Sequence, residues 1–283
     1  MQAKTAEAET SGLQLVPFSA RVPDTGSRRQ WMAQDNIGIV VAMPEELRPI
    51  LRRFATHRKE QTGQFPVYLL RLDGRSLTII QSGMGVQKAA AATNELIRYA
   101  TPRILISAGF AGGVRKGLAV GDVVLAGQSL ALSEGVLSDA GTLGSESLLA
   151  ALAEHFSGHP FRIAGGTTIT TRSIVRKRTA DQQIAQEIVN PVLDMETSAV
   201  AETAARNGIP LVAIRAISDA AEEELLFSLD EITDRNQNIR IRKVLITIAK
   251  NPCILPQMLR LAKNSKRAGS NLAIVLERLV RMA

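Results

Sequence analysis

Short apolar runs alternate with stretches of helical periodicity through most of the chain. The first run, residues 37–43, is unbroken, which is typical of a strand buried on both faces of a sheet. Residues 44–54 follow with proline at the first helical position, two glutamates in the first turn and apolar residues at helical spacing. The runs 67–72 and 77–81 are joined by Asp73-Gly74, a pair that predicts a β-hairpin.

The same alternation continues to about residue 217. It predicts helices over 89–99, 146–155 and the second half of 193–207, and strands over 103–107, 123–126, 161–167 and 209–217. Short strands that alternate with helices favour an α/β fold with a largely parallel or mixed central sheet.

The pattern changes at both ends of the chain, and we divide it into three parts. Residues 1–34 mix Ser, Thr, Pro, Gly and charged residues without periodicity, which predicts a flexible N-terminal extension. Residues 35–234 form the predicted catalytic domain. Residues 235–283 form a C-terminal helical appendix, in which prolines separate helices over 240–250 and 255–282.

The basic character of the protein is confined to that appendix. The net charge is +7, and the isoelectric point is about 9.9. Residues 235–283 contain eleven Lys or Arg and one acid, a net charge of +10, which leaves −3 for residues 1–234. Because the appendix has no aromatic residue for base stacking and no known RNA- or DNA-binding motif, we do not expect a nucleic-acid partner.

Residue usage narrows the chemistry further. With 45% hydrophobic residues, the chain can bury a core. The single cysteine, Cys253, excludes an internal disulfide, and the three histidines have no metal-ligand spacing, so we expect no metal site. Neither a membrane-spanning apolar run nor a signal peptide is recognisable, which makes a cytoplasmic location the default.

Three acids stand just beyond predicted strands, where α/β proteins bind their ligands. They are Glu46, Glu196 and Asp219. Taken singly, Glu46 suits a helix N-terminus and Asp219 a helix cap. Two glycine-rich turns, 82–85 and 109–113, lie between these acids in the sequence and allow close approach of a ligand, although tight packing explains such turns equally well. Together these features favour a binding site.

Five segments in a fixed order resemble a known family, the nucleoside phosphorylase superfamily. They are IGIVVAMPEE (37–46), QSGMG (81–85), SAGFAGG (107–113) with VGD (120–122), DMETSA (194–199) and RAISD (215–219). The resemblance covers about residues 36–222 and is closest to the methylthioadenosine/S-adenosylhomocysteine nucleosidases. It implies a three-layer α/β/α fold with a central mixed sheet, a homodimer, and cleavage of the N-glycosidic bond of a purine nucleoside without a cofactor.

The resemblance also implies roles for particular residues. Asp219 is similar to the acid that hydrogen-bonds or protonates purine N7, and Glu46 to the carboxylate that orients or deprotonates water. Glu196 corresponds to the acceptor for the ribose hydroxyls. The remaining implied contacts are Met195 on the sugar, Ser218 and the Val175 backbone at the base edge, and Ser82 and Gly83 near the ribose or its nucleophile.

Two departures from the family pattern bear on the substrate and the nucleophile. The loop expected to cover adenine carries Arg172 and Ile174 where nucleosidases have an acid and an aromatic residue. Arg48 resembles a phosphate ligand of the phosphorolytic members, so phosphate is an alternative co-substrate. We favour water, because Glu46 would repel phosphate in the same pocket.

The appendix leaves further alternatives open. Residues 255–262 are similar to the ends of hopanoid-associated phosphorylases, which implies adenosylhopane as an alternative substrate. Apolar residues at helical spacing beside the basic residues predict peripheral contact with an anionic membrane, although helices of this kind more commonly pack on their own domain. A non-catalytic module that binds an adenosyl ligand is the alternative outside enzymes.

Overall fold

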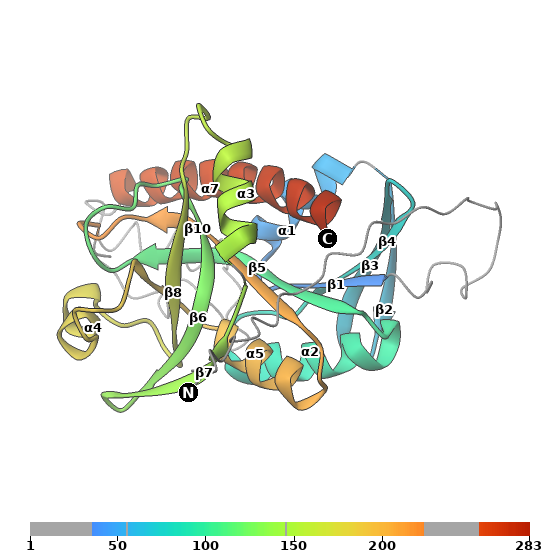
Figure 1. The fold of residues 1–283 in the computed structure, drawn as a ribbon, viewed down its shortest axis with the longest axis horizontal. Coiled ribbons are helices and arrows are strands. Elements are labelled where there is room, and N and C mark those ends of the chain that lie inside the picture. Colours follow the sequence, from blue (N-terminus) through green and yellow to red (C-terminus); the bar gives the residue numbers. More distant parts are fainter. Residues whose placement is uncertain (1–35, 55, 145, 224–254) are drawn as a thin grey trace, which may run out of the picture.

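The computed structural model describes residues 36–54, 56–144, 146–223 and 255–283. The predicted N-terminal extension and the helix predicted over 240–250 lie outside these residues, as does the boundary drawn at residue 235. Within them, a mixed sheet has helices on both faces (Figure 1). The predicted α/β class with a central mixed sheet is therefore confirmed.

Ten strands form this sheet, in the order β10-β6-β8-β9-β5-β1-β4-β3-β2, with β7 paired to β6. Strand β10 also pairs with β5, so that five of the strands close into a ring. The strands are β1 (Asn36–Val41), β2 (His57–Thr62), β3 (Phe65–Leu72), β4 (Arg75–Gln81), β5 (Ile104–Gly113), β6 (Val123–Ser133), β7 (Val136–Thr142), β8 (Ile163–Thr171), β9 (Pro191–Asp194) and β10 (Leu211–Asp219).

Strands β1, β4, β5 and β10 run parallel and are buried on both faces, as the unbroken apolar runs predict. The hairpin of β3 and β4 turns at Asp73-Gly74, both with positive φ, which suits the tight turn expected there. Strands β2 and β7 were not predicted. They are polar and largely exposed, so they lack the apolar alternation from which a strand is recognised.

Helices cover the two faces of the sheet in separate layers. Helices α1 (Pro44–Phe54), α3 (Glu146–His155) and α7 (Leu255–Met282) contribute to one apolar core. Helices α2 (Val86–Ala100) and α5 (Thr197–Arg206) contribute to another on the opposite side. Side chains alternate between the two cores along β1, with Ile39 in the first and Val40 in the second.

The long helix α7 is built into the first core rather than lying apart from it. Its apolar stripe is buried against α1 and the sheet, and comprises Ala268, Leu272, Ala273, Val275, Leu276, Leu279 and Val280. The stripe that suggested a lipid-facing helix is therefore satisfied largely within the protein. None of the helices in the described ranges is both long enough and apolar enough to cross a membrane.

This packing predicts a contrast between two leucines of α7. Leu276 is fully buried, whereas Leu259 is 63% exposed. We expect Leu276→Ala to lower the free energy of unfolding by about 2–5 kcal/mol, because it removes buried methyl groups and leaves a cavity. Leu259→Ala should change it by no more than about 0.5 kcal/mol. Urea unfolding of both variants measures the difference, and equal effects would show that α7 does not share the core.

Candidate active site

Strand β5 is the common support of the three acids singled out in the sequence. Glu46 lies in the first turn of α1 and accepts a hydrogen bond from the backbone N–H of Phe110 in β5. Asp219 ends β10 and is in register with Gly112 of β5. Glu196 follows β9, which runs antiparallel to β5. The acids therefore gather along the end of β5 and not simply at a row of parallel strand ends.

Two glycines of β5 make room for these carboxylates. A Cβ on Gly109 would lie 2.9 Å from Oε1 of Glu46, and one on Gly112 would lie 2.7 Å from Oδ2 of Asp219. Both distances are shorter than ordinary contacts, so any larger residue would displace an acid. The glycine-rich run 109–113 thus has a specific use in this structure, which is to let two side chains reach the sheet backbone.

Glu46 is buried and held by three backbone donors. Its Oε2 accepts from the N–H groups of Ala42 at 3.1 Å and Met43 at 2.8 Å, and its Oε1 accepts from Phe110 at 2.7 Å. Burial raises the pKa of Glu46 to about 6, while these hydrogen bonds and the charge of Arg215 limit the rise. Near neutral pH its carboxylate can therefore both exist and accept a proton.

Glu196 is half-buried beside the other acids. Its Oε1 accepts from the N–H of Gly85 at 2.7 Å. Gly85 has φ +99, in the region that glycine favours, and this conformation turns the chain into α2. Burial and repulsion from Asp194, together with the charge of Glu46, raise the pKa of Glu196 to about 8 against the effect of Gly85 and Arg215.

Asp219 is held on both carboxylate oxygens. Ser218 donates its hydroxyl to Oδ1 at 2.7 Å, and Nζ of Lys177 lies 2.5 Å from Oδ2. Lys177 begins helix α4 (Lys177–Gln183), and its side chain is only 9% exposed. The sequence analysis did not identify Lys177. The one sequence feature that could have pointed to Lys177 is its place two positions after Val175, but the segment around it is rich in basic residues.

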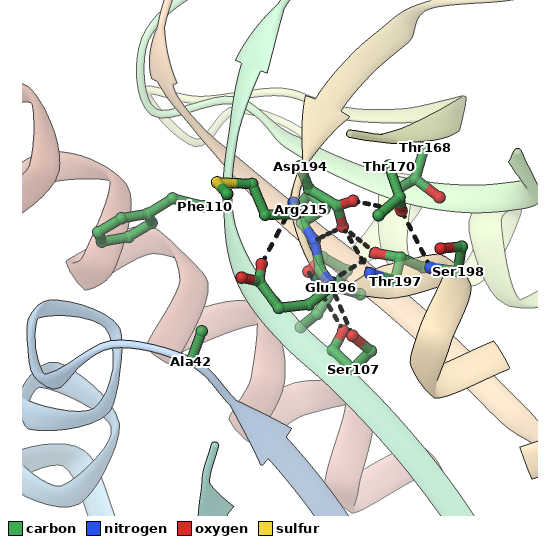
Figure 2. A network of polar contacts seen from close by, with 12 residues as sticks. Ala42, Ser107, Phe110, Thr168, Thr170, Asp194, Glu196, Thr197, Ser198 and Arg215 are labelled. Carbon is green, nitrogen blue, oxygen red and sulfur yellow. Dashed lines mark hydrogen bonds and ion pairs between the residues drawn. The ribbon is translucent and has the colours of Figure 1, made fainter. Parts of the chain in front are cut away.

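A buried ion pair between Arg215 and Asp194 lies next to Glu196 (Figure 2). Nε of Arg215 is 2.8 Å from Oδ2 of Asp194, and the two side chains are 2% and 0% exposed. The guanidinium also donates to the hydroxyls of Thr197 and Ser107, at 2.6 Å and 2.7 Å. Thr170 donates to the other oxygen of Asp194 at 2.6 Å. Both ends of the pair are therefore hydrogen-bonded as well as paired, which offsets the cost of burial.

The structure distributes the other predicted site residues unevenly. Ser82 is buried, and its hydroxyl donates to the carbonyl of Gly83 at 2.8 Å. Met195 is half-buried and donates its N–H to Glu196, and Val175 is half-buried against an apolar cluster. Arg48 is exposed on α1, although the nearby Glu46 is buried. The roles assigned to these residues stay predictions.

The segments that carry the resemblance therefore supply the buried ion pair as well as the three acids. Arg215 opens RAISD and Asp194 opens DMETSA, but the sequence offered no reason to pair them across the fold. No group of three or more potential metal ligands occurs among His, Cys, Asp and Glu in the part of the chain that the structure describes.

The family follows from the sequence profile of the Phosphorylase superfamily, which matches residues 36–250. The chain belongs to this superfamily. It is similar to the 5′-methylthioadenosine/S-adenosylhomocysteine nucleosidase of Listeria welshimeri, with 32% identity over 213 residues, 69% of this chain and 91% of the relative. The enzyme of the same name from Actinobacillus succinogenes is 31% identical over 208 residues, 69% of this chain and 90% of the relative. The predicted resemblance is confirmed.

Solved structures agree with the fold. The methylthioadenosine/S-adenosylhomocysteine nucleosidase of Helicobacter pylori superposes with a TM-score of 0.64 at 17% identity, covering 88% of this chain and 99% of that one. Futalosine hydrolase from the same organism also gives 0.64 at 18% identity, covering 88% and 98%. At this level of identity, the likeness concerns the fold alone.

The raised pKa of Glu196 predicts how stability changes with pH. The folded protein keeps a proton on Glu196 that the unfolded chain releases above a pKa of 4.5. Its contribution to stability is therefore full below 4.5 and is lost as the pH rises through about 8. We expect Glu196→Gln to reduce the loss of unfolding free energy between pH values of about 5 and about 9.

Urea unfolding across that pH range measures this effect. Glu202→Gln is the matched control, because Glu202 lies on α5 with its side chain 55% exposed. It should leave the pH dependence of the wild type intact. If Glu196→Gln and Glu202→Gln gave the same pH dependence as the wild type, Glu196 would not be an acid of raised pKa.

Proposed function

We propose that this protein hydrolyses the N-glycosidic bond of a 5′-substituted adenosine and releases adenine. The observation that carries the proposal is the gathering of Glu46, Glu196 and Asp219 along the glycine-rich end of β5. An acid for the leaving base, an acceptor for the sugar and a base for water are the groups that this reaction needs. The names of the nucleosidase relatives support the same reaction class.

Each acid suits one part of the reaction. Water attacks C1′ of the ribose while the bond to the purine nitrogen breaks, and the electron pair of that bond stays on the base. Glu46, with a pKa of about 6, takes the proton of the attacking water. Asp219 hydrogen-bonds or protonates N7 of the leaving base. Glu196 binds the ribose hydroxyls beside the backbone N–H of Gly85.

Water is favoured over phosphate by the charges around the site. Two buried or half-buried acids, Glu46 and Glu196, would face an incoming dianion. The buried cation, Arg215, is already bound to Asp194, Thr197 and Ser107. Arg48, the alternative phosphate ligand, is exposed.

The 5′ substituent separates two candidate substrates. One is a small thioether, as the names of the relatives suggest. The other is an adenosyl lipid such as adenosylhopane, in keeping with the resemblance of residues 255–262. A non-catalytic adenosyl-ligand binder remains the alternative in another class.

A panel of 5′-substituted adenosines, incubated with and without phosphate and followed by mass spectrometry, tests the proposal. We expect adenine and the 5′-substituted ribose, without phosphate attached, in both conditions, and a fall of about 10²–10⁴-fold in adenine release for Asp219→Asn. The loss should come without unfolding, because the amide keeps the size of the carboxylate.

Asp139→Asn is the control, since Asp139 lies on an exposed part of β7. It should release adenine at the wild-type rate. Strict dependence on phosphate would overturn the hydrolytic assignment. Binding of the adenosines without any release of adenine would favour the binder.

We also infer that the first turns of α7 contact an anionic membrane. Leu259 is 63% exposed there, and the neighbouring Lys263 and Lys266 are exposed too. Basic residues near such a surface contribute about 1 kcal/mol each. Deleting the whole helix would be a poor test, because its second half belongs to the core.

Point changes on the exposed face avoid that problem. We expect the combined variant Leu259→Ser, Lys263→Glu, Lys266→Glu to bind phosphatidylserine vesicles at least about 10-fold more weakly than the wild type in a sedimentation assay. Lys116→Glu, at an exposed position after β5, is the control for a simple loss of charge. Equal binding by the combined variant and the wild type would exclude contact through this face.

A further inference from the structure

Lys177 occupies a position where a buried lysine is costly. It is the first residue of helix α4, where the helix dipole disfavours a positive charge, and its side chain is 9% exposed. Lysine is almost never buried unless it is paired. Because burial and the dipole both oppose the ammonium group, its contacts must compensate for them.

Those contacts all lie on one short segment. Nζ of Lys177 is 2.5 Å from Oδ2 of Asp219 and also donates to the carbonyls of Asp219 at 3.1 Å and Ala220 at 2.5 Å. With Ser218 on Oδ1, both oxygens of the Asp219 carboxylate are engaged. The ammonium group of Lys177 is the one N–H donor that contacts Oδ2 of Asp219 in the part of the chain that the structure describes, and it lies on the side of the carboxylate opposite Ser218.

Helix α4 is anchored so that Lys177 stays in place. Arg115 pairs with Asp181 at 2.7 Å and donates to the carbonyls of Ile184 and Ile188 just beyond the helix. At the other end, Lys177 comes two residues after Val175, which the family resemblance puts at the base edge. The segment over the base and the acid for the base are therefore tied together by one side chain.

We propose that Lys177 is a positioning residue for Asp219 and the source of the proton that the leaving purine receives. The inference rests on the proposed function. As the C1′–N9 bond breaks and its electron pair remains on the purine, a proton moves from the ammonium of Lys177 to the Asp219 carboxylate, and Asp219 passes it on to N7. Lys177 is left as a neutral amine and Glu46 carries the proton of the attacking water. Before the next turnover Glu46 releases its proton to solvent and Lys177 takes one from solvent.

A double-mutant cycle on kcat tests this dependence. We expect Lys177→Met to lower kcat about 10- to 100-fold, in line with the cost of misplacing a catalytic group. In Asp219→Asn the same substitution should cost almost nothing, because Lys177 acts through Asp219. Arg178→Met is the matched control, since Arg178 is the next residue of α4 and is exposed. Losses that multiply in the double variant, or an unchanged kcat in Lys177→Met, would overturn the proposal.

Two further measurements keep the proposal testable if Lys177→Met does not fold or if the wild type shows no turnover. Gly112→Ala should act like Lys177→Met even if the latter does not fold, because its Cβ would meet Oδ2 of Asp219 at 2.7 Å and Cε of Lys177 at 3.2 Å. The second measurement is the affinity for a small molecule by titration calorimetry, which does not require the enzyme to turn over. Its probe is the 4-amino-5H-pyrrolo[3,2-d]pyrimidine inhibitor bound in the Helicobacter pylori nucleosidase, whose ring carries a hydrogen at the position of purine N7.

We expect Lys177→Met to bind this inhibitor at least about 10-fold more weakly than the wild type, because Asp219 is no longer held to accept that hydrogen. Unchanged affinity would overturn the role of Lys177. A wild type that releases no adenine from any adenosine would instead overturn the proposed function, and the calorimetric comparison would still decide the role of Lys177.

Discussion

The buried ion pair between Arg215 and Asp194 is the interaction on which the site depends. It joins the middle of β10 to the end of β9, and Thr197 and Thr170 extend it to α5 and β8. Removing one partner of such a pair typically costs about 3–5 kcal/mol, because the other charge stays buried. The pair therefore holds the end of β9 against β10 and so positions Met195 and Glu196, the two residues that follow β9.

The same cation makes a cluster of acids tolerable. Three carboxylates, those of Glu46, Asp194 and Glu196, lie within electrostatic reach of Arg215 or of one another. Burial raises the pKa of both Glu46 and Glu196 and Arg215 lowers it, while repulsion from Asp194 and Glu46 raises the pKa of Glu196 further. The balance leaves Glu46 near 6 and Glu196 near 8, so the two acids titrate in different ranges although both are glutamates on the same side of the fold. Differences of this kind allow neighbouring carboxylates to take different parts in one reaction.

Glycine contributes to the site by what it lacks. Gly109 and Gly112 leave the space that Glu46 and Asp219 fill, and Gly85 turns its N–H toward Glu196 in a conformation that other residues rarely adopt. The sequence analysis weighed 82–85 and 109–113 as glycine-rich turns, and the second prediction was wrong, because residues 109–113 are the last five residues of strand β5. The register of β10 against β5 sets Asp219 opposite Gly112, and the packing of α1 sets Glu46 beside Gly109.

Much of this protein could be predicted from the sequence because the signals are local. The apolar runs of β1, β4, β5 and β10 and the hairpin at Asp73-Gly74 follow from period and turn chemistry, and the order of the motifs identified the family. The polar strands β2 and β7 escaped detection, because edge strands need no apolar face.

By itself, the sequence determined the fold class, the family and the three acids. It also determined the contrast in charge between residues 1–234, with a net charge of −3, and residues 235–283, with a net charge of +10. The tertiary structure decided the partners. It paired Arg215 with Asp194 and Lys177 with Asp219, and it buried the apolar stripe of α7 in the core. These outcomes depend on residues far apart in the chain, and burial, which the sequence does not encode locally, sets both the cost of a charge and the partner that it needs.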